Sequence, residues 1–249
     1  MIMSSITERN HLAKPKIFGC SVTGPNNQRR GEPCQDAWGG RMWQSSAGAV
    51  RAIAIADGMG SKKYSRQGAN AAVASALRAA KNWAAHPQIG TNWLIRWLEA
   101  EWRYTLGDLD PNDCGTTCWL AVSSPHAGLL VIGLGDGFAL CASGDEEPNI
   151  ISGRKDDDFS NETLALGVTH KSSDWKVRHF PSTPELWLVV LATDGVADDI
   201  RGDRIGSFLQ WVKEISSLKH PARGIRRALK KWPVEAHTDD KTVAAITNH

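Results

Sequence analysis

Five apolar, strand-like segments of this chain each adjoin a short turn that carries an aspartate. In the clearest case the run 52–56, A-I-A-I-A, is followed at once by Asp57 and Gly58. A buried, unpaired carboxylate is costly, so it needs a cation, several hydrogen bonds or solvent. This recurrence constrains the fold strongly, because it predicts strands of a shared sheet, or of two facing sheets, whose aspartates gather at one end.

The other four sites repeat this pattern along the chain. They are Asp36 before A-W, Asp136 between two strands, Asp194 after L-W-L-V-V-L-A-T, and Asp239 before V-A-A-I. Asp-Gly is also a common turn dipeptide, so a single such site fits an ordinary turn. As a set, the carboxylates would repel one another, and a hard divalent cation would relieve that repulsion. An all-oxygen set without His or Cys favours magnesium or manganese over zinc.

Hydrophobic periodicity predicts the order of strands and helices. The expected strands are 17–22, 34–43, 50–57, 116–123, 128–134, 138–142, 186–193 and 242–247, and the expected helices are 66–85, 92–106, about 203–216 and 222–232. Thr91 is expected to cap the second helix. Strands come in runs that are separated by helices, which predicts an α+β fold rather than a parallel doubly wound sheet.

Composition limits the classes of partner. With 249 residues the chain can bury a sizeable core, and a net charge of +2 gives no indication of a nucleic-acid or membrane partner. The five cysteines lack the spacing of a zinc site and are expected to be reduced, buried thiols. Without a signal-like or membrane-spanning apolar run, the sequence predicts a cytoplasmic protein.

The polarity of the chain also predicts its organisation. Residues 1–15 are polar and end at a proline, which indicates a flexible N-terminal arm. Residues 16–249 are expected to form one domain. Within it, segment 143–180 is polar and rich in turn residues, which predicts an exposed loop or flap.

Six short motifs give the chain a family resemblance. In order they are C-Q-D-A (34–37), A-D-G-M-G (56–60), G-T-T (115–117), G-D-G (135–137), T-D-G-V (193–196) and D-D-K-T (239–242). The series resembles the metal-dependent protein phosphatases, the PPM or protein phosphatase 2C family, over roughly residues 17–247. The form R-x-G-x-P-C-Q-D-A resembles that of a bacterial subgroup. The resemblance implies a four-layer α-β-β-α sandwich of two mostly antiparallel sheets.

The resemblance also implies a centre of two Mg²⁺ or Mn²⁺ ions at one end of the sandwich. By position, Asp57 would bridge the two ions and the carbonyl of Gly58 would bind one of them. Asp194 and Asp239 would complete the shell of the other ion. Asp36 would reach the ions directly or through water. In the family, a hydroxide that bridges the metals attacks phosphorus in line, without a phosphoenzyme intermediate.

Two further aspartates take different roles by the same resemblance. Asp113, four residues before Thr117, is placed like the acid that some bacterial members use for a third, weaker metal. Asp136 would have a structural role in the turn between two strands. The flap-like segment 143–180 matches the position of the family's variable flap, which would help to choose substrates.

The chain departs from the family pattern at several positions. Gly31 stands where members usually have a phosphate-binding arginine; Arg30 either binds phosphate from a shifted register or is a surface arginine. Met59 replaces the histidine that some members place after the motif-two Asp-Gly. His237 either substitutes as a proton donor or is a solvated loop histidine. Gln35 replaces an acid next to Asp36, which is expected to weaken support around the metals.

Three hypotheses about function follow. The first is a serine/threonine phosphoprotein phosphatase, monomeric, that acts on a phosphorylated protein in opposition to a cognate kinase. The second is a catalytically weak pseudophosphatase that binds a phosphorylated partner. The third is a hydrolase of another phosphoester such as a nucleotide, against which the absence of a Gly-rich nucleotide loop counts.

Overall fold

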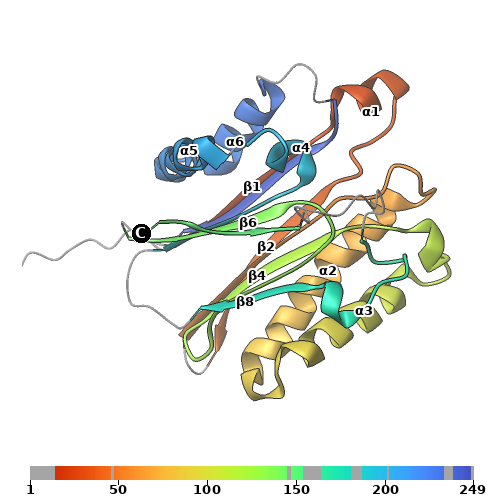
Figure 1. The fold of residues 1–249 in the computed structure, drawn as a ribbon, viewed down its shortest axis with the longest axis horizontal. Coiled ribbons are helices and arrows are strands. Elements are labelled where there is room, and N and C mark those ends of the chain that lie inside the picture. Colours follow the sequence, from red (N-terminus) through yellow and green to blue (C-terminus); the bar gives the residue numbers. More distant parts are fainter. Residues whose placement is uncertain are drawn as a thin grey trace, which may run out of the picture.

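The computed structural model describes residues 15–45, 48–144, 147–153, 164–180, 187–200, 202–232 and 238–247. Within these residues the chain forms two five-stranded antiparallel sheets that pack face to face, and helices cover both outer faces (Figure 1). The predicted α+β fold with α-β-β-α layers is confirmed. The predicted N-terminal arm, apart from Pro15, lies outside the described residues.

The first sheet places the earliest and the latest strands of the chain side by side. Its order is β1 (Lys16–Val22), β10 (Lys241–Thr247), β9 (Trp187–Ala192), β6 (Phe138–Ser143) and β7 (Asn149–Ser152). Its outer face is covered by α4 (Asp194–Ala197), α5 (Ile205–Ser217) and α6 (Pro221–Lys230), and α1 (Pro25–Arg30) lies above one end (Figure 1). The core below α5 and α6 is built from apolar side chains such as Phe208, Val212 and Ile225.

The second sheet carries two long helices. Its order is β2 (Ala37–Ser45), β3 (Gly48–Ala56), β4 (Cys118–Ser124), β5 (Gly128–Leu134) and β8 (Lys176–Phe180). Its outer face is covered by α2 (Ser65–Ala85) and α3 (Thr91–Leu106). The connections contain the short 3-10 helices η1 (Pro87–Ile89), η2 (Pro111–Asp113), η3 (Ser172–Asp174) and η4 (Gly202–Arg204).

The alternation in 52–56 explains how β3 fits between these layers. Ile53 and Ile55 face the first sheet and pack in the core between the sheets, whereas Ala52, Ala54 and Ala56 face α2. Successive side chains of a strand point to opposite faces, so one short run serves both interfaces. The small alanines of β3 and α2 let the helix lie close to the sheet.

The predicted helices all form, with small differences. The second begins at Thr91 itself, and Gly90 precedes it without a side-chain cap, so the expected capping role of Thr91 is wrong. In this helix Leu94, Ile95, Leu98 and Trp102 are buried, whereas Trp97 is 39% exposed. No helix within the described ranges combines the length and the apolar character that crossing a membrane requires.

Among the α-helices and strands of the described residues, four were not predicted. They are α1, α4, β7 and β8, of which β7 and β8 lie in the flap-like segment 143–180. That segment therefore contributes one edge strand to each sheet. Residues 145–146 and 154–163 of the segment lie outside the described residues, so its flap role stays a prediction.

Candidate active site

Four aspartates stand at the same end of the sandwich. Asp36 directly precedes β2 and Asp57 directly follows β3, and the adjacent residues Ala37 and Ala56 are paired across the second sheet. In the first sheet Asp194 follows the end of β9, and Asp239 precedes the start of β10. We call this set of four side chains, Asp36, Asp57, Asp194 and Asp239, the acidic edge.

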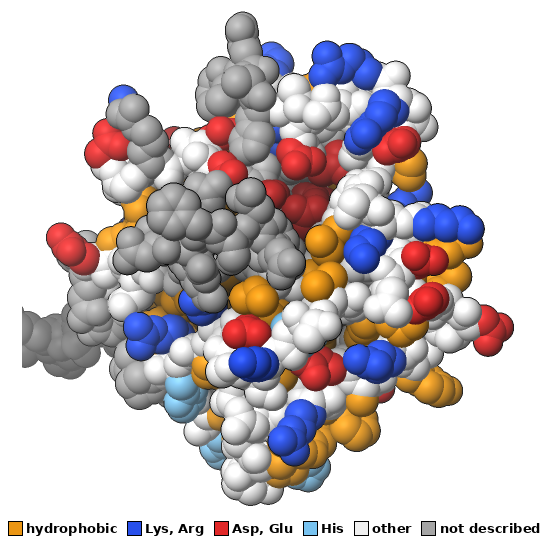
Figure 2. All heavy atoms as spheres, turned by 45° about the vertical axis from the view of Figure 1, so that its right-hand side comes forward, with side chains coloured by type: hydrophobic (Ala, Val, Ile, Leu, Met, Phe, Trp, Pro, Cys, Tyr) orange, Lys and Arg blue, Asp and Glu red, His pale blue; other side chains and the backbone are white. Residues whose placement is uncertain are grey.

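The acidic edge is electrostatically crowded. Burial raises the pKa of Asp57 well above its usual value, and the negative charges of Asp36, Asp194 and Asp239 raise it further. Figure 2, which brings the right-hand side of Figure 1 forward, shows acidic side chains gathered in a hollow of the surface. Three aspartates that are widely separated in the sequence therefore act on Asp57 in the fold.

Asp36 has one satisfied and one unsatisfied oxygen. Its Oδ2 accepts a hydrogen bond of 2.9 Å from the hydroxyl of Thr193, and its buried Oδ1 has no hydrogen-bond partner. Burial raises the pKa of Asp36 to about 7, and the negative charge of Asp240 adds to this effect, whereas the hydrogen bond from Thr193 opposes it. A buried carboxylate oxygen without a partner is an acceptor to which a cation can bind.

The donor set fits a hard divalent cation. Within the described part of the chain, no three His, Cys, Asp or Glu side chains already surround a common point as the shell of an ion does. Yet the unpartnered Oδ1 of Asp36 and the repulsion at Asp57 are what a bound cation would relieve. Because the edge offers carboxylate oxygens only, magnesium or manganese suits it better than zinc.

Local hydrogen bonds orient the two aspartates of the first sheet. Oδ1 of Asp194 accepts from the backbone N–H of Gly195 at 2.6 Å, and Oδ1 of Asp239 accepts from the backbone N–H of Asp240 at 2.8 Å. The two turns also touch, because a Cβ placed on Gly195 would lie 1.9 Å from the carbonyl oxygen of Asp240. Glycine at 195 therefore lets the helix that begins at Asp194 approach the turn that carries Asp239.

The G-T-T motif holds the backbone around Asp57. The N–H of Asp57 donates to Oγ1 of Thr117 at 2.9 Å, and the carbonyl of Asp57 accepts from the N–H of Thr117 at 2.8 Å. Thr116 adds a bond of 2.8 Å from its hydroxyl to the same carbonyl. A Cβ on Gly58 would lie 2.6 Å from the carbonyl oxygen of Ser65, so only glycine fits beside Asp57.

Sequence reasoning missed the buried Asp240. Its two carboxylate oxygens accept from the N–H of Gly24 at 2.6 Å, from Nδ2 of Asn27 at 3.0 Å and from the N–H of Gln35 at 2.6 Å. These bonds tie the segment that leads into Asp36 to the turn before β10. In the sequence, Asp240 is indicated only as the second aspartate of the motif D-D-K-T, and the prediction assigned a role only to the first, Asp239.

Gln35 supports the site through its backbone. Its N–H donates to Asp240, and its carbonyl accepts from the N–H of Gly58 at 3.3 Å. These two backbone bonds are available to any non-proline residue at this position. The backbone support that position 35 gives to the site therefore does not depend on whether its side chain is a glutamine or an acid.

Arg30 ends α1 and makes contacts within its own segment. Its Nη2 donates to Oδ1 of Asn27 at 2.8 Å, and its Nε lies 3.6 Å from the carboxylate of Glu32. The guanidinium is more than half exposed, so it remains accessible to a ligand. The structure does not place Arg30 among the groups that act on Asp57.

The remaining predicted residues lie in nearby turns. Asp113 is exposed at the end of η2, and its carbonyl accepts from the N–H of Tyr64 at 2.8 Å. Asp136 lies in the turn between β5 and β6, where its carbonyl accepts from Nε1 of Trp119 at 3.1 Å. That contact uses the backbone of Asp136, so the structural role expected for its side chain stays a prediction. His237 lies outside the described residues.

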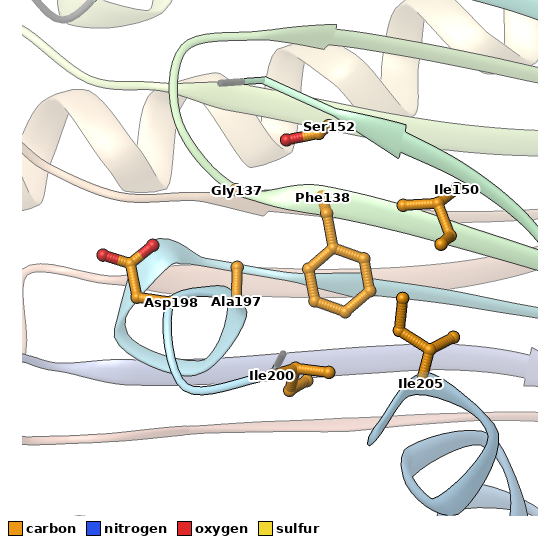
Figure 3. Close-up of a pocket in the computed structure, with 8 residues that line it drawn as sticks. All are labelled: Gly137, Phe138, Ile150, Ser152, Ala197, Asp198, Ile200 and Ile205. Atoms are coloured by element: carbon orange, nitrogen blue, oxygen red, sulfur yellow. The ribbon is translucent and has the colours of Figure 1, made fainter. Parts of the chain in front are cut away.

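A separate small pocket lies on the outer side of the first sheet (Figure 3). Its volume is about 100 Å³, and its lining residues are Gly137, Phe138, Ile150, Ser152, Ala197, Asp198, Ile200 and Ile205. Figure 3 shows its apolar side chains gathered between β6, β7 and the chain after α4, with Asp198 pointing away from them. None of the residues of the acidic edge lines it. Its apolar character does not suit it to hold a metal.

An α-β-β-α sandwich with aspartates clustered at the ends of its strands is the arrangement that the resemblance to the metal-dependent protein phosphatases implied. A sequence model described as "Protein phosphatase 2C" matches residues 23–232. The chain belongs to the protein phosphatase 2C family. No curated protein matches this sequence.

Solved structures agree with this assignment at the level of the fold. RsbX in complex with magnesium is similar with a TM-score of 0.57 and 16% identity, over 97% of this chain and 98% of that one. The PPM Ser-Thr phosphatase MsPP from Mycobacterium smegmatis, in complex with cacodylate, is similar with a TM-score of 0.54 and 18% identity, over 94% of this chain and 98% of that one. The structure of the phosphatase domain and a regulatory fragment of SpoIIE from Bacillus subtilis has a TM-score of 0.55 and 15% identity, over 94% of this chain and 63% of that one.

Proposed function

We propose that this protein is a serine/threonine phosphoprotein phosphatase of the bacterial cytoplasm, monomeric and opposed to a cognate kinase. The observation that carries the proposal is the acidic edge, in which the charges of three aspartates act on Asp57. Membership of the protein phosphatase 2C family supports the reaction class. The substrate class draws on the likeness to MsPP, which is described as a Ser-Thr phosphatase.

In this proposal the acidic edge holds two Mg²⁺ or Mn²⁺ ions. The residues that would hold these ions are Asp57, Gly58 through its backbone carbonyl, Asp194 and Asp239. Asp36 offers its unpartnered Oδ1. Bound ions of this kind supply the Lewis acidity that activates water for attack on phosphorus and offsets the phosphate charge. The chain's own part is to keep these oxygens in place, which the bonds of Thr193, Thr117 and Gly195 do.

Further residues complete the proposed site. Arg30 would bind a substrate phosphate, for which its exposed guanidinium is suited. Asp113 would hold a third, weaker metal from its exposed position in η2. We further propose that 16–249 form one phosphatase domain, in which the segment 143–180 acts as a flap that helps to select the phosphoprotein substrate.

The test is hydrolysis of p-nitrophenyl phosphate and of a phosphothreonine peptide by the purified protein. Activity is compared with added manganese, with magnesium and with chelator. Asp194→Asn is expected to lose most activity. The matched control is Asp203→Asn, which should keep it, because Asp203 is an exposed residue whose carboxylate lies 3.8 Å from Nε of Arg204. Well-folded protein that binds manganese but hydrolyses no phosphoester would contradict the proposal.

A second candidate is a pseudophosphatase that binds a phosphorylated partner without turnover. Two observations favour it: Arg30 is engaged by Asn27 and Glu32, and Met59 occupies the position of a family histidine. Binding of a phosphopeptide measured by calorimetry, with no phosphate release at saturating manganese, would support this candidate over the first. A panel that includes nucleotides tests the remaining class of substrate.

A further inference from the structure

A half-buried cluster joins helix α3 to the segment that precedes β8. Oε1 of Glu99, on α3, accepts from Nε2 of His170 at 2.9 Å and from Nε1 of Trp175 at 3.0 Å. His170 and Trp175 belong to the described segment 164–180, at the end of the flap-like insertion. We call Glu99 and His170 the clasp.

Both ring nitrogens of His170 face oxygen atoms that can only accept. Nδ1 lies 2.8 Å from the carbonyl oxygen of Val168, and Nε2 lies 2.9 Å from Glu99. A neutral imidazole has one N–H and can satisfy only one of these acceptors, whereas the imidazolium has two and satisfies both. The geometry therefore selects the charged form of His170.

The charged groups around the clasp favour the same form. The hydrogen bond to Glu99 raises the pKa of His170 most, and the carbonyl of Val168 and the charges of Glu99 and Asp174 add to it, while burial opposes. Bonding to His170 lowers the pKa of Glu99, and Trp175 and Arg103 contribute in the same direction against burial. Both shifts favour the form of the clasp in which His170 is protonated and Glu99 is ionised.

The clasp lies four residues from a contact with the G-T-T motif. Leu166 exchanges two backbone hydrogen bonds with Thr116, of 2.9 Å and 3.1 Å. Gly167 has φ +79, and a Cβ there would lie 2.3 Å from the carbonyl of Pro111 and 3.1 Å from Trp102. The turn between Leu166 and His170 is therefore closely packed against α3 and η2, with little room to absorb a shift.

Thr116 connects this turn to Asp57. Its hydroxyl donates to the carbonyl of Asp57 at 2.8 Å, and the next residue, Thr117, pairs with the backbone of Asp57 on both sides. The chain from His170 to Leu166, followed by the hydrogen bonds of Thr116, thus connects the clasp to Asp57 in the acidic edge.

We propose that Glu99 and His170 are positioning residues for Asp57, because the clasp holds the 164–170 segment that supports the backbone of Asp57 through Thr116. The proposal rests on the proposed function in one respect, namely that Asp57 binds the metal. When His170 loses its proton, one of its two hydrogen bonds is lost. The Leu166–Thr116 pair then opens more often, and the site holds a divalent cation less well.

The experiment measures amide hydrogen exchange at Thr116 and Leu166 in metal-free protein between pH 6 and 9, corrected for intrinsic exchange rates. In the wild type, the opening of the Leu166–Thr116 pair should increase about three- to tenfold as His170 loses its proton. This is the effect expected from the loss of one charge-assisted hydrogen bond in a half-buried site. Glu99→Gln should open more at pH 6 and lose this pH dependence. Glu101→Gln, on the same helix but paired with Arg78 at 2.5 Å, should keep it.

A second variant guards against a folding defect in the first. His170→Gln stays neutral at every pH, retains one donor group and should show the same flat exchange profile as Glu99→Gln. Calorimetry then compares manganese affinity at pH 6.5, where both clasp variants should bind about three- to tenfold more weakly than wild type.

The outcomes separate the two proposals. A wild-type protein that binds no manganese would overturn the proposed function and with it the metal role of the clasp. The positioning role alone would be overturned by a different result. In that result Glu99→Gln and His170→Gln bind manganese as the wild type does, and hydrogen exchange at Thr116 and Leu166 keeps its pH dependence in both variants.

Discussion

The hydroxyl of Thr193 donates a hydrogen bond of 2.9 Å to Oδ2 of Asp36, and so joins the end of β9 in one sheet to the start of β2 in the other. Oγ1 of Thr193 in turn accepts a hydrogen bond of 3.0 Å from the backbone N–H of Thr242. One side chain therefore links three segments at the acidic edge. Because of this link, the position of Asp36 depends on the register of both sheets.

Replacing Asp36 by Asn is expected to stabilise the metal-free protein at neutral pH and to weaken manganese binding. The pKa of Asp36 is raised from 3.8 to about 7, so between these values the folded state keeps a proton that the unfolded state releases. The free energy of unfolding should then fall by roughly 1 kcal/mol per pH unit from about pH 4 to 7. Urea unfolding in chelator at several pH values should show a smaller slope for Asp36→Asn, and identical slopes would contradict this assignment.

Asp240→Asn is expected to destabilise the protein by about 2 kcal/mol, because one carboxylate oxygen that accepts a backbone or amide N–H is replaced by a donor. Asp240 is buried and accepts from Gly24, Asn27 and Gln35. The exposed control Asp203→Asn should change the free energy of unfolding by less than about 0.5 kcal/mol. Urea denaturation measures both; equal effects would show that Asp240 does not hold the segment before Asp36.

Gly58→Ala tests the space beside Asp57. The added methyl group would lie 2.6 Å from the carbonyl of Ser65 and 2.9 Å from that of Gln35, so the backbone must move. We expect a loss of about 1–3 kcal/mol in stability and a weaker affinity for manganese in calorimetry. At Gly60 the same change meets only the side-chain Oε1 of Gln35, at 3.5 Å, and Gly60→Ala should bind manganese normally. Similar losses in both variants would argue against a steric cause.

Arg30→Gln tests the proposed phosphate contact. The side chain of Arg30 is exposed and can reach a substrate. If it donates a charged hydrogen bond to the phosphate, the loss of that bond in Arg30→Gln should raise KM for a phosphothreonine peptide about tenfold. Arg29 lies next to it on α1 and bonds to Asn26 at 2.5 Å, so Arg29→Gln is the matched control. Unchanged kinetics in Arg30→Gln would leave Arg30 as a surface arginine whose contacts are Asn27 and Glu32.

The fold could be predicted where the residue pattern itself determines burial. The alternation of Ile and Ala in 52–56 places a strand between a facing sheet and a helix, and the structure uses both faces in this way. The acidic edge was predictable for a related reason. Aspartates next to apolar strands must lie at strand ends, and antiparallel pairing of β2 with β3 brings Asp36 and Asp57 together.

The missed features depend on contacts between distant residues. Helix α1, with the sequence P-N-N-Q-R-R, has no apolar stripe, and it is held by the bond of Asn27 to Asp240, 213 residues away. Strand β8, K-V-R-H-F, is polar because it is an edge strand that pairs only with β5. The clasp was equally hidden, since Glu99 and His170 are 71 residues apart and neither belongs to a motif.

The position of β10 between β1 and β9 has a consequence for protein synthesis. The ribosome releases β1 early, but the neighbour that shields its edge consists of residues 241–247, which are made more than 200 residues later. Until then the first sheet is split and the turn that carries Asp239 has no strand to anchor it. Pairing this distant in sequence is slow to form. A nascent chain therefore lacks the complete acidic edge until translation has passed β10.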